Sequence, residues 1–98
     1  GANIGNVAVA FEDLRDMMER IHATPFASLL NDFPPGAVNG GVSNDYTVIV
    51  GGYTLLSEQI TVTYPVQTSD FLELVVTVDW MEGSRSRSKS LSSVRTSS

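Results

Sequence analysis

An amphipathic helix near the N-terminus constrains this 98-residue chain more than any other feature. Between Val7 and His22, apolar residues recur at steps of three and four, which is the period of one helix face. Charged residues occupy the positions between them and would face water. The predicted apolar stripe consists of Val7, Phe11, Leu14, Met18 and Ile21. Such a stripe must be buried against another element, so we predict a helix over about 7–22 with Asn6 as its cap.

The length and composition indicate a single globular domain over 1–98. With 42% hydrophobic and 17% charged residues, the chain has ordinary globular composition, and a chain of this length supports one core. No run of eighteen apolar residues occurs, so no segment of this sequence reads as a membrane span. The absence of cysteine excludes disulfides and thiolate metal ligands.

The remainder of the chain reads as a loop region followed by a sheet. Pro25 ends or kinks the helix, and the loop region covers about 23–44, with a short helical turn near Phe26 and Leu29. Alternating and β-branched residues then predict four strands, at 45–50, 58–64, 70–82 and 84–95. We therefore expect an α+β domain, in which the N-terminal helix packs on a four-stranded antiparallel sheet over about 45–95.

The last predicted hairpin allows two registers. A two-residue turn at Glu82-Gly83 places bases opposite Val76 and Val78, on the apolar face of the sheet. A three-residue turn with Gly83 as a bulge shifts the register by one residue and reverses the faces of the last strand. We favour the second register, because it turns the serines inward and pairs Asp79 with Arg87 on the outer face.

The charges are unevenly distributed along the chain, which has a net charge of −5. All eleven acidic residues lie in 1–82 together with two bases, whereas 83–98 contains four bases and no acid. This basic run could be an arm that binds nucleic acid or anionic lipid. It is short and contains no aromatic residue for base stacking, so we favour a strand over a nucleic-acid arm.

The sequence carries no signal for an enzyme, a cofactor or a metal site. His22 has no thiol partner and stands at a helix end, where a structural role is expected. Glu73 and Asp79 share a strand face, but at ~3.3 Å per residue they lie roughly 20 Å apart, too far for a carboxylate pair. The glycine pairs at 40–41 and 51–52 lack the residues of a phosphate-binding loop.

Three stretches of the sequence together resemble type IV pilus minor pilins and the related type II secretion pseudopilins. The segment 10–21, A-F-E-D-L-R-D-M-M-E-R-I, is similar to the A-x-x-L-x-x-x-M-E-R-I pattern that follows the membrane anchor of such minor pilins. The stretch 60–63, I-T-V-T, is similar to one of their strands. The third stretch, 74–80 with Gly83 and the run to Thr96, is similar to their V-x-V-x-W…G…L-x-T ending.

The resemblance implies a structural, non-enzymatic subunit that primes assembly of a filament or occupies its tip. Family members begin with a cleavage site and a hydrophobic helix of about 20 residues, long enough to cross a bilayer. This sequence starts without that segment, so we expect a chain that lacks its anchor. The implied location is the inner membrane, with the globular domain in the periplasm, and then a filament. The implied partners are other pilin or pseudopilin subunits.

Exposed apolar and basic residues of the predicted sheet are the expected contact surface. These residues are Phe71, Val75, Leu91, Arg85, Arg87 and Lys89, to which we add the loop 37–44. Three functions remain open at this point: a pilus subunit, a pseudopilin, and a small nucleic-acid-binding module that uses the basic C-terminal strand.

Overall fold

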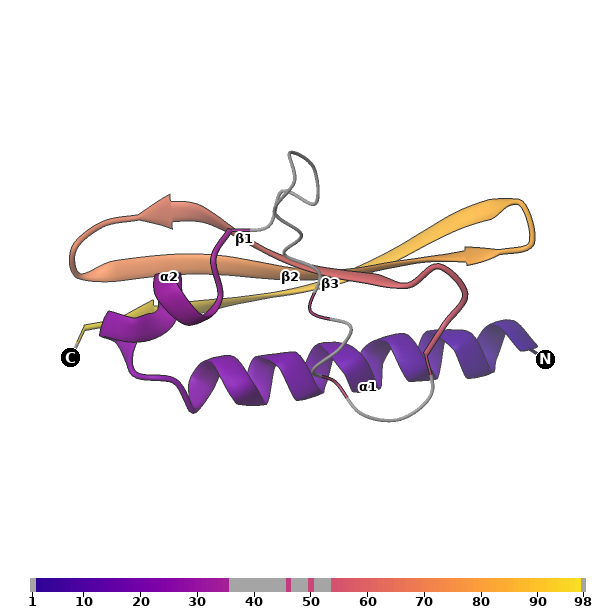
Figure 1. Ribbon diagram of the computed structural model, residues 1–98, viewed down its shortest axis with the longest axis horizontal. Coiled ribbons are helices and arrows are strands. Elements are labelled where there is room, and N and C mark those ends of the chain that lie inside the picture. The colour runs from indigo at the N-terminus through magenta and orange to yellow at the C-terminus, as the bar shows by residue number, and fades with distance from the viewer. Residues whose placement is uncertain (1, 36–45, 47–49, 51–53, 98) are drawn as a thin grey trace.

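A long N-terminal helix lies along one face of an antiparallel sheet (Figure 1). The computed structural model describes residues 2–35, 46, 50 and 54–97. Helix α1 (Ala2–His22) is followed by the 3-10 turn η1 (Phe26–Ser28) and the short helix α2 (Leu29–Asp32). Strands β1 (Gln59–Gln67), β2 (Phe71–Glu82) and β3 (Arg85–Thr96) then form a meander. The predicted helical turn after Pro25 is confirmed.

The predicted helix is confirmed, but its start and its buried face differ from the expectation. Asn6 does not cap the helix, since it lies within α1, where its amide donates to Glu82 at 3.3 Å. Phe11 is 39% exposed, and Val7 and Met18 are only partly buried. The buried stripe is rotated by about one residue and contains Ala10, Asp13, Leu14, Met17 and Ile21. This stripe also follows the helical period, and it places a carboxyl group in the interface with the sheet.

The predicted four-stranded sheet is wrong, although the α+β class is confirmed. The sheet of the described residues has three strands, in the order β1-β2-β3. The predicted strand 45–50 falls largely outside the described residues; Tyr46 and Val50 are described, and neither is part of a strand. The backbone N–H of Tyr46 nevertheless donates to the carbonyl of Ile60 at 2.9 Å, beside β1.

Strand β1 runs further than predicted because a bulge accommodates its proline. We expected a loop over 65–69, but β1 continues to Gln67, and its register against β2 shifts between Thr63 and Val66. Pro65 lies within this irregularity, where the missing N–H does not interrupt a regular ladder.

The core lies between the helices and one face of the sheet. Tyr64 connects the two layers, since its hydroxyl donates to the carbonyls of Phe33 at 2.6 Å and of Leu29 at 3.4 Å. The hydroxyl of Tyr46 donates to the carbonyl of Pro34 at 2.8 Å. Burial raises the pKa of Tyr64 to about 12, so this donor keeps its proton over the whole physiological range. The sheet contributes Ile60, Val62, Leu72, Leu74, Val76, Val78 and Trp80 to the core.

The preferred register of the last hairpin is wrong, and so is the alternative. The turn consists of Gly83 and Ser84, between the paired residues Glu82 and Arg85. Gly83 has φ 62° at the first turn position, where a type II′ hairpin turn takes glycine because other residues are strained there. As a result Val78 lies opposite Lys89 and Trp80 lies opposite Arg87. The bases of β3 therefore lie on the helix side of the sheet together with Ser93, whereas Ser86, Ser88, Ser90 and Ser92 lie on the outer face.

The edge position of β3 explains how bases can occupy the helix side. A long basic side chain at an edge can cover apolar neighbours with its aliphatic stem while its charged group reaches water. Arg87 forms an ion pair with Glu82 at 3.5 Å. Arg95 donates to the carbonyl of Ile21 at 2.6 Å and to that of Thr24 at 2.8 Å, at the C-terminal end of α1. A cation at this position satisfies open carbonyls and complements the helix dipole.

Replacing Arg95 with alanine is expected to lower the free energy of unfolding by about 1–3 kcal/mol. The variant loses two hydrogen bonds from a charged donor to backbone carbonyls at the end of α1. Urea denaturation of the two proteins measures the difference. Arg95→Lys is the matched control: it keeps the charge but not the two-pronged geometry, so its loss should be smaller but measurable. Equal stability of all three proteins would contradict this role.

Candidate functional site

The predicted contact residues are divided between two faces of the β2–β3 hairpin. Phe71 and Val75 lie on the outer face, together with four serines of β3: Ser86, Ser88, Ser90 and Ser92. The other predicted contact residues lie on the helix side of β3: Arg85, Arg87, Lys89 and Leu91. The structure therefore does not bring the six residues together. The predicted contact loop 37–44 lies outside the described residues.

An apolar patch surrounds a single carboxylate on the outer face. Glu73 pairs with Val66 of β1 on one side and with Val94 of β3 on the other. Phe71 and Val75 lie two residues away on the same face of β2, because strand side chains alternate. Val94 is 50% exposed and Val66 is 39% exposed, whereas Phe71 and Val75 are half-buried. We refer to Val66, Phe71, Glu73, Val75 and Val94 as the outer patch.

Sequence reasoning identified Phe71 and Val75 but missed the other three residues of this patch. With the predicted register, Val94 would have faced the helix, and Val66 would have been part of a loop. The residue types carried a usable signal, since valine is a poor choice for a solvent-exposed turn and a good one for a strand. The side-chain carboxylate of Glu73 has no hydrogen bond or ion pair with any described residue, so its charge is available to a partner.

The bases on the helix side of β3 differ in whether they interact with other groups of the fold. Glu82 accepts hydrogen bonds from the indole of Trp80 at 3.1 Å and from Asn6. These bonds and the nearby charges of Arg87 and Arg85 lower the pKa of the Glu82 carboxyl. The side-chain ammonium of Lys89 has no hydrogen bond or ion pair within the described part of the chain. It shares this side of β3 with Leu91, which is exposed, and we refer to these two residues as the basic edge.

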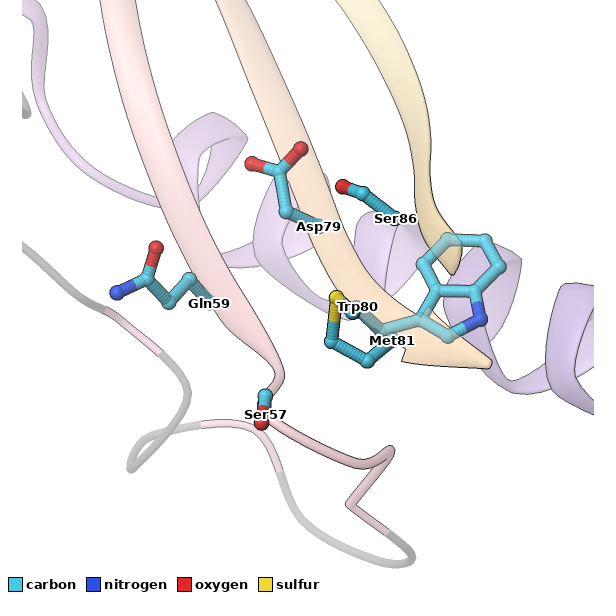
Figure 2. Close-up of a pocket in the computed structure, with 6 residues that line it drawn as sticks. All are labelled: Ser57, Gln59, Asp79, Trp80, Met81 and Ser86. Atoms are coloured by element: carbon cyan, nitrogen blue, oxygen red, sulfur yellow. The ribbon is translucent and has the colours of Figure 1, made fainter. Parts of the chain in front are cut away.

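A shallow hollow of about 290 Å³ lies near the tip of the hairpin (Figure 2). Figure 2 shows Gln59, Asp79 and Ser86 on three adjacent strands; the hollow is also lined by Ser57, Trp80 and Met81. The carboxylate, amide and hydroxyl groups of these side chains can accept hydrogen bonds from a polar partner, and the amide and hydroxyl groups can also donate them. The hollow is open, so these polar groups are accessible to a partner.

A second polar feature is buried, and sequence reasoning missed it. Asp13 of α1 is 4% exposed and Glu58, which precedes β1, is 7% exposed. The two carboxyl groups lie within hydrogen-bonding range of each other. Burial, the hydrogen bond to Glu58 and the negative charges around it raise the pKa of Asp13 to about 8. We refer to Asp13 and Glu58 as the carboxyl pair.

Two patterns in the sequence could have indicated the carboxyl pair. Glu58 has the same parity as Ile60, Val62 and Tyr64, so the alternation of β1 extended backward places it on the core side. Asp13 lies between Ala10 and Met17 on a second apolar stripe of the helix. The general rule that carboxylates face water concealed both residues.

The remaining candidate of the sequence, His22, is placed at the end of α1. Its Nε2 lies 2.9 Å from the hydroxyl of Ser93 on β3, a contact that joins the helix to the edge strand. Within the described ranges, no three His, Asp or Glu residues gather as a metal ligand set. None of the helices in these ranges is long and apolar enough to cross a membrane.

No protein-family model, curated protein or solved structure matches this chain.

Proposed function

We propose that this chain is a structural subunit of a pilus-like filament, as a minor pilin or a type II secretion pseudopilin. The resemblance of the segments 10–21, 60–63 and 74–96 to that family supports the proposal, as does an N-terminal helix packed on an antiparallel meander (Figure 1). In this proposal an anchor encoded upstream of Gly1 holds the domain at the inner membrane, facing the periplasm, until it is assembled.

The observation that carries the proposal is the division of the contact residues between two unlike faces. The outer patch is apolar with a negative centre, and the basic edge pairs a lysine with an exposed leucine. Lys89 of one copy could approach Glu73 of the next while Leu91 packs on Phe71 or Val75. A contact between two different faces is heterologous and repeats without closing when the rotation between copies does not form a ring. Such a contact builds filaments.

The nucleic-acid-binding alternative is less well supported. Of the four bases in 83–98, Arg95 binds the end of α1, Arg87 pairs with Glu82, and Arg85 acts on the same carboxyl. A binding arm needs its bases free to neutralise phosphates. If this alternative were correct, the chain would bind DNA or RNA with an affinity that falls steeply with salt.

The gene sequence upstream of Gly1 gives the first test. We expect a short basic leader and a hydrophobic stretch with glutamate at the fifth position after the cleavage site. An initiating methionine directly before Ala2 would remove the anchor and contradict the filament proposal. A conventional cleaved signal peptide would contradict it equally.

Cysteine cross-linking tests the heterologous contact directly, because the native chain contains no cysteine. Val94→Cys and Leu91→Cys are made separately in the full-length gene product and expressed together in cells that assemble it. We expect mixed cross-links at several times the yield of either variant alone. Ser69→Cys, in the β1–β2 turn, is the matched control for random collision. Cross-links restricted to identical variants would indicate a closed two-fold dimer and contradict the proposal.

A further inference from the structure

We propose that Asp13 and Glu58 form a buried proton-binding site, in which one shared proton holds helix α1 to the turn before β1. This inference concerns the fold of the chain itself and does not depend on the proposed filament function. Two ionised carboxylates are both acceptors and cannot hydrogen-bond each other, so the contact between these groups requires a proton on one of them. The bound ligand of this site is therefore the proton.

The surroundings of the pair favour a neutral acid over two charges. No donor of the described residues reaches the buried Oδ2 of Asp13. A carboxylate removed from water without donors is strongly destabilised, and a second negative charge nearby adds to that cost. One carboxyl group of a close pair therefore keeps its proton at pH values where an exposed acid has lost it.

Within the described part of the chain, no base contributes to the charge environment of Asp13. The charged groups that act on Asp13 are Glu58 on the facing turn and Asp16 and Glu12 on its own helix, and all three are acids. On the helix side of the sheet, β1 and β2 present apolar side chains and Tyr64, followed by Glu82 at the end of β2. The bases on the helix side of β3 do not offset the shift at Asp13: Arg85, Arg87, Lys89 and Arg95.

Glu58 connects the proton to the geometry of the turn. Its Oε1 accepts the backbone N–H of Leu55 at 2.7 Å, and its own N–H donates to the carbonyl of Leu55 at 3.1 Å. The turn contains Ser57 at φ 53°, a left-handed conformation that is costly for a residue other than glycine. The carbonyl of Leu56 accepts the N–H of Met81 at 2.9 Å, which fixes the turn to β2. Loss of the proton would push the helix away from this turn.

The pH dependence of stability has a definite sign. The pKa of Asp13 is raised from 3.8 in the ordinary state to about 8 in the fold, so the folded chain binds a proton that the unfolded chain releases. Stability is therefore greatest at low pH within this range, falls as pH rises from about 4 to 8, and is then level. Within the window, each pH unit multiplies the unfolding equilibrium constant by up to tenfold.

Urea denaturation of the whole chain between pH 5 and 9, followed by Trp80 fluorescence, tests the site. We expect the wild-type unfolding constant to increase by about 10²-fold or more between pH 5 and pH 8. Asp13→Asn supplies an amide donor to Glu58 without a titrating proton, so its unfolding constant should change much less over the same range. Glu19→Gln, which removes an exposed acid of the same helix that does not act on Asp13, is the matched control and should keep the wild-type dependence.

A second variant and a spectroscopic readout complete the test. Glu58→Gln should also flatten the pH dependence, and it keeps the acceptor for Leu55 if Asp13→Asn fails to fold. Infrared spectroscopy at pH 7 should show the carbonyl band of a protonated carboxyl group in the wild type and not in Asp13→Asn. A wild-type stability that is constant or rises between pH 5 and 8, without that band, would overturn the inference.

Discussion

Replacing Trp80 with alanine is expected to lower the free energy of unfolding by about 3–5 kcal/mol. The indole is fully buried on the helix side of β2, and its N–H donates to Glu82 at 3.1 Å. The variant leaves a cavity between the sheet and α1 and removes one of the two neutral donors that hold the Glu82 carboxylate. A domain of this size has a total free energy of unfolding of about 5–15 kcal/mol, so the variant would lose a large part of its stability.

Urea denaturation followed by far-ultraviolet circular dichroism measures this loss, because the variant has no remaining tryptophan. Trp80→Phe keeps one aromatic ring and loses the N–H donor and part of the indole volume, so we expect a smaller loss of about 1–3 kcal/mol. Met81→Ala, on the opposite face of the same strand, should cost less than about 1 kcal/mol. A Trp80→Ala variant within about 1 kcal/mol of the wild type would contradict the placement of this residue in the core.

The parts of the fold that were predictable are those with long, regular apolar patterns. The alternation from Leu72 to Trp80 predicts the central strand and its buried face, and both are confirmed. The helix was equally predictable as an element, because many residues contribute to its period. The buried face of the helix was not predictable, because two neighbouring stripes satisfy the same period. One of them passes through Phe11 and the other through Met17.

The register of the last hairpin depended on a single backbone angle. Whether Gly83 is the first or a later residue of the turn changes the pairing by one position, and that step exchanges the two faces of β3. The serine–base alternation fits either outcome, because bases at an edge strand can reach solvent from both faces. Sequence reasoning avoided bases on the apolar side, but the end of α1 and Glu82 provide partners there.

The candidate sites follow the same division between local and non-local information. Exposed apolar residues such as Val75 could be identified from the strand pattern alone. Their grouping with Val66 and Val94 around Glu73 needed the pairing of three strands. The carboxyl pair needed still more, because Asp13 and Glu58 are far apart in the sequence and each looks like an ordinary surface acid.

The two helix stripes make opposite predictions for a pair of variants. Met17→Ala should cost about 2–5 kcal/mol, because Met17, which belongs only to the observed stripe, is fully buried and its truncation leaves a cavity. Phe11→Ala should cost less than about 1 kcal/mol, although phenylalanine is the larger side chain, because Phe11 is 39% exposed. Both substitutions place alanine in a helix interior, so the change in helix propensity is small and favours neither result.

Urea denaturation followed by Trp80 fluorescence compares the two variants under identical conditions. Met18→Ala extends the comparison, since Met18 belonged to the predicted stripe and is only partly buried, and we expect an intermediate loss. A larger loss for Phe11→Ala than for Met17→Ala would mean that the helix packs on the stripe of Val7, Phe11 and Met18. That rotation of α1 would also turn Asp13 away from Glu58, so the same result would remove the structural basis of the carboxyl pair.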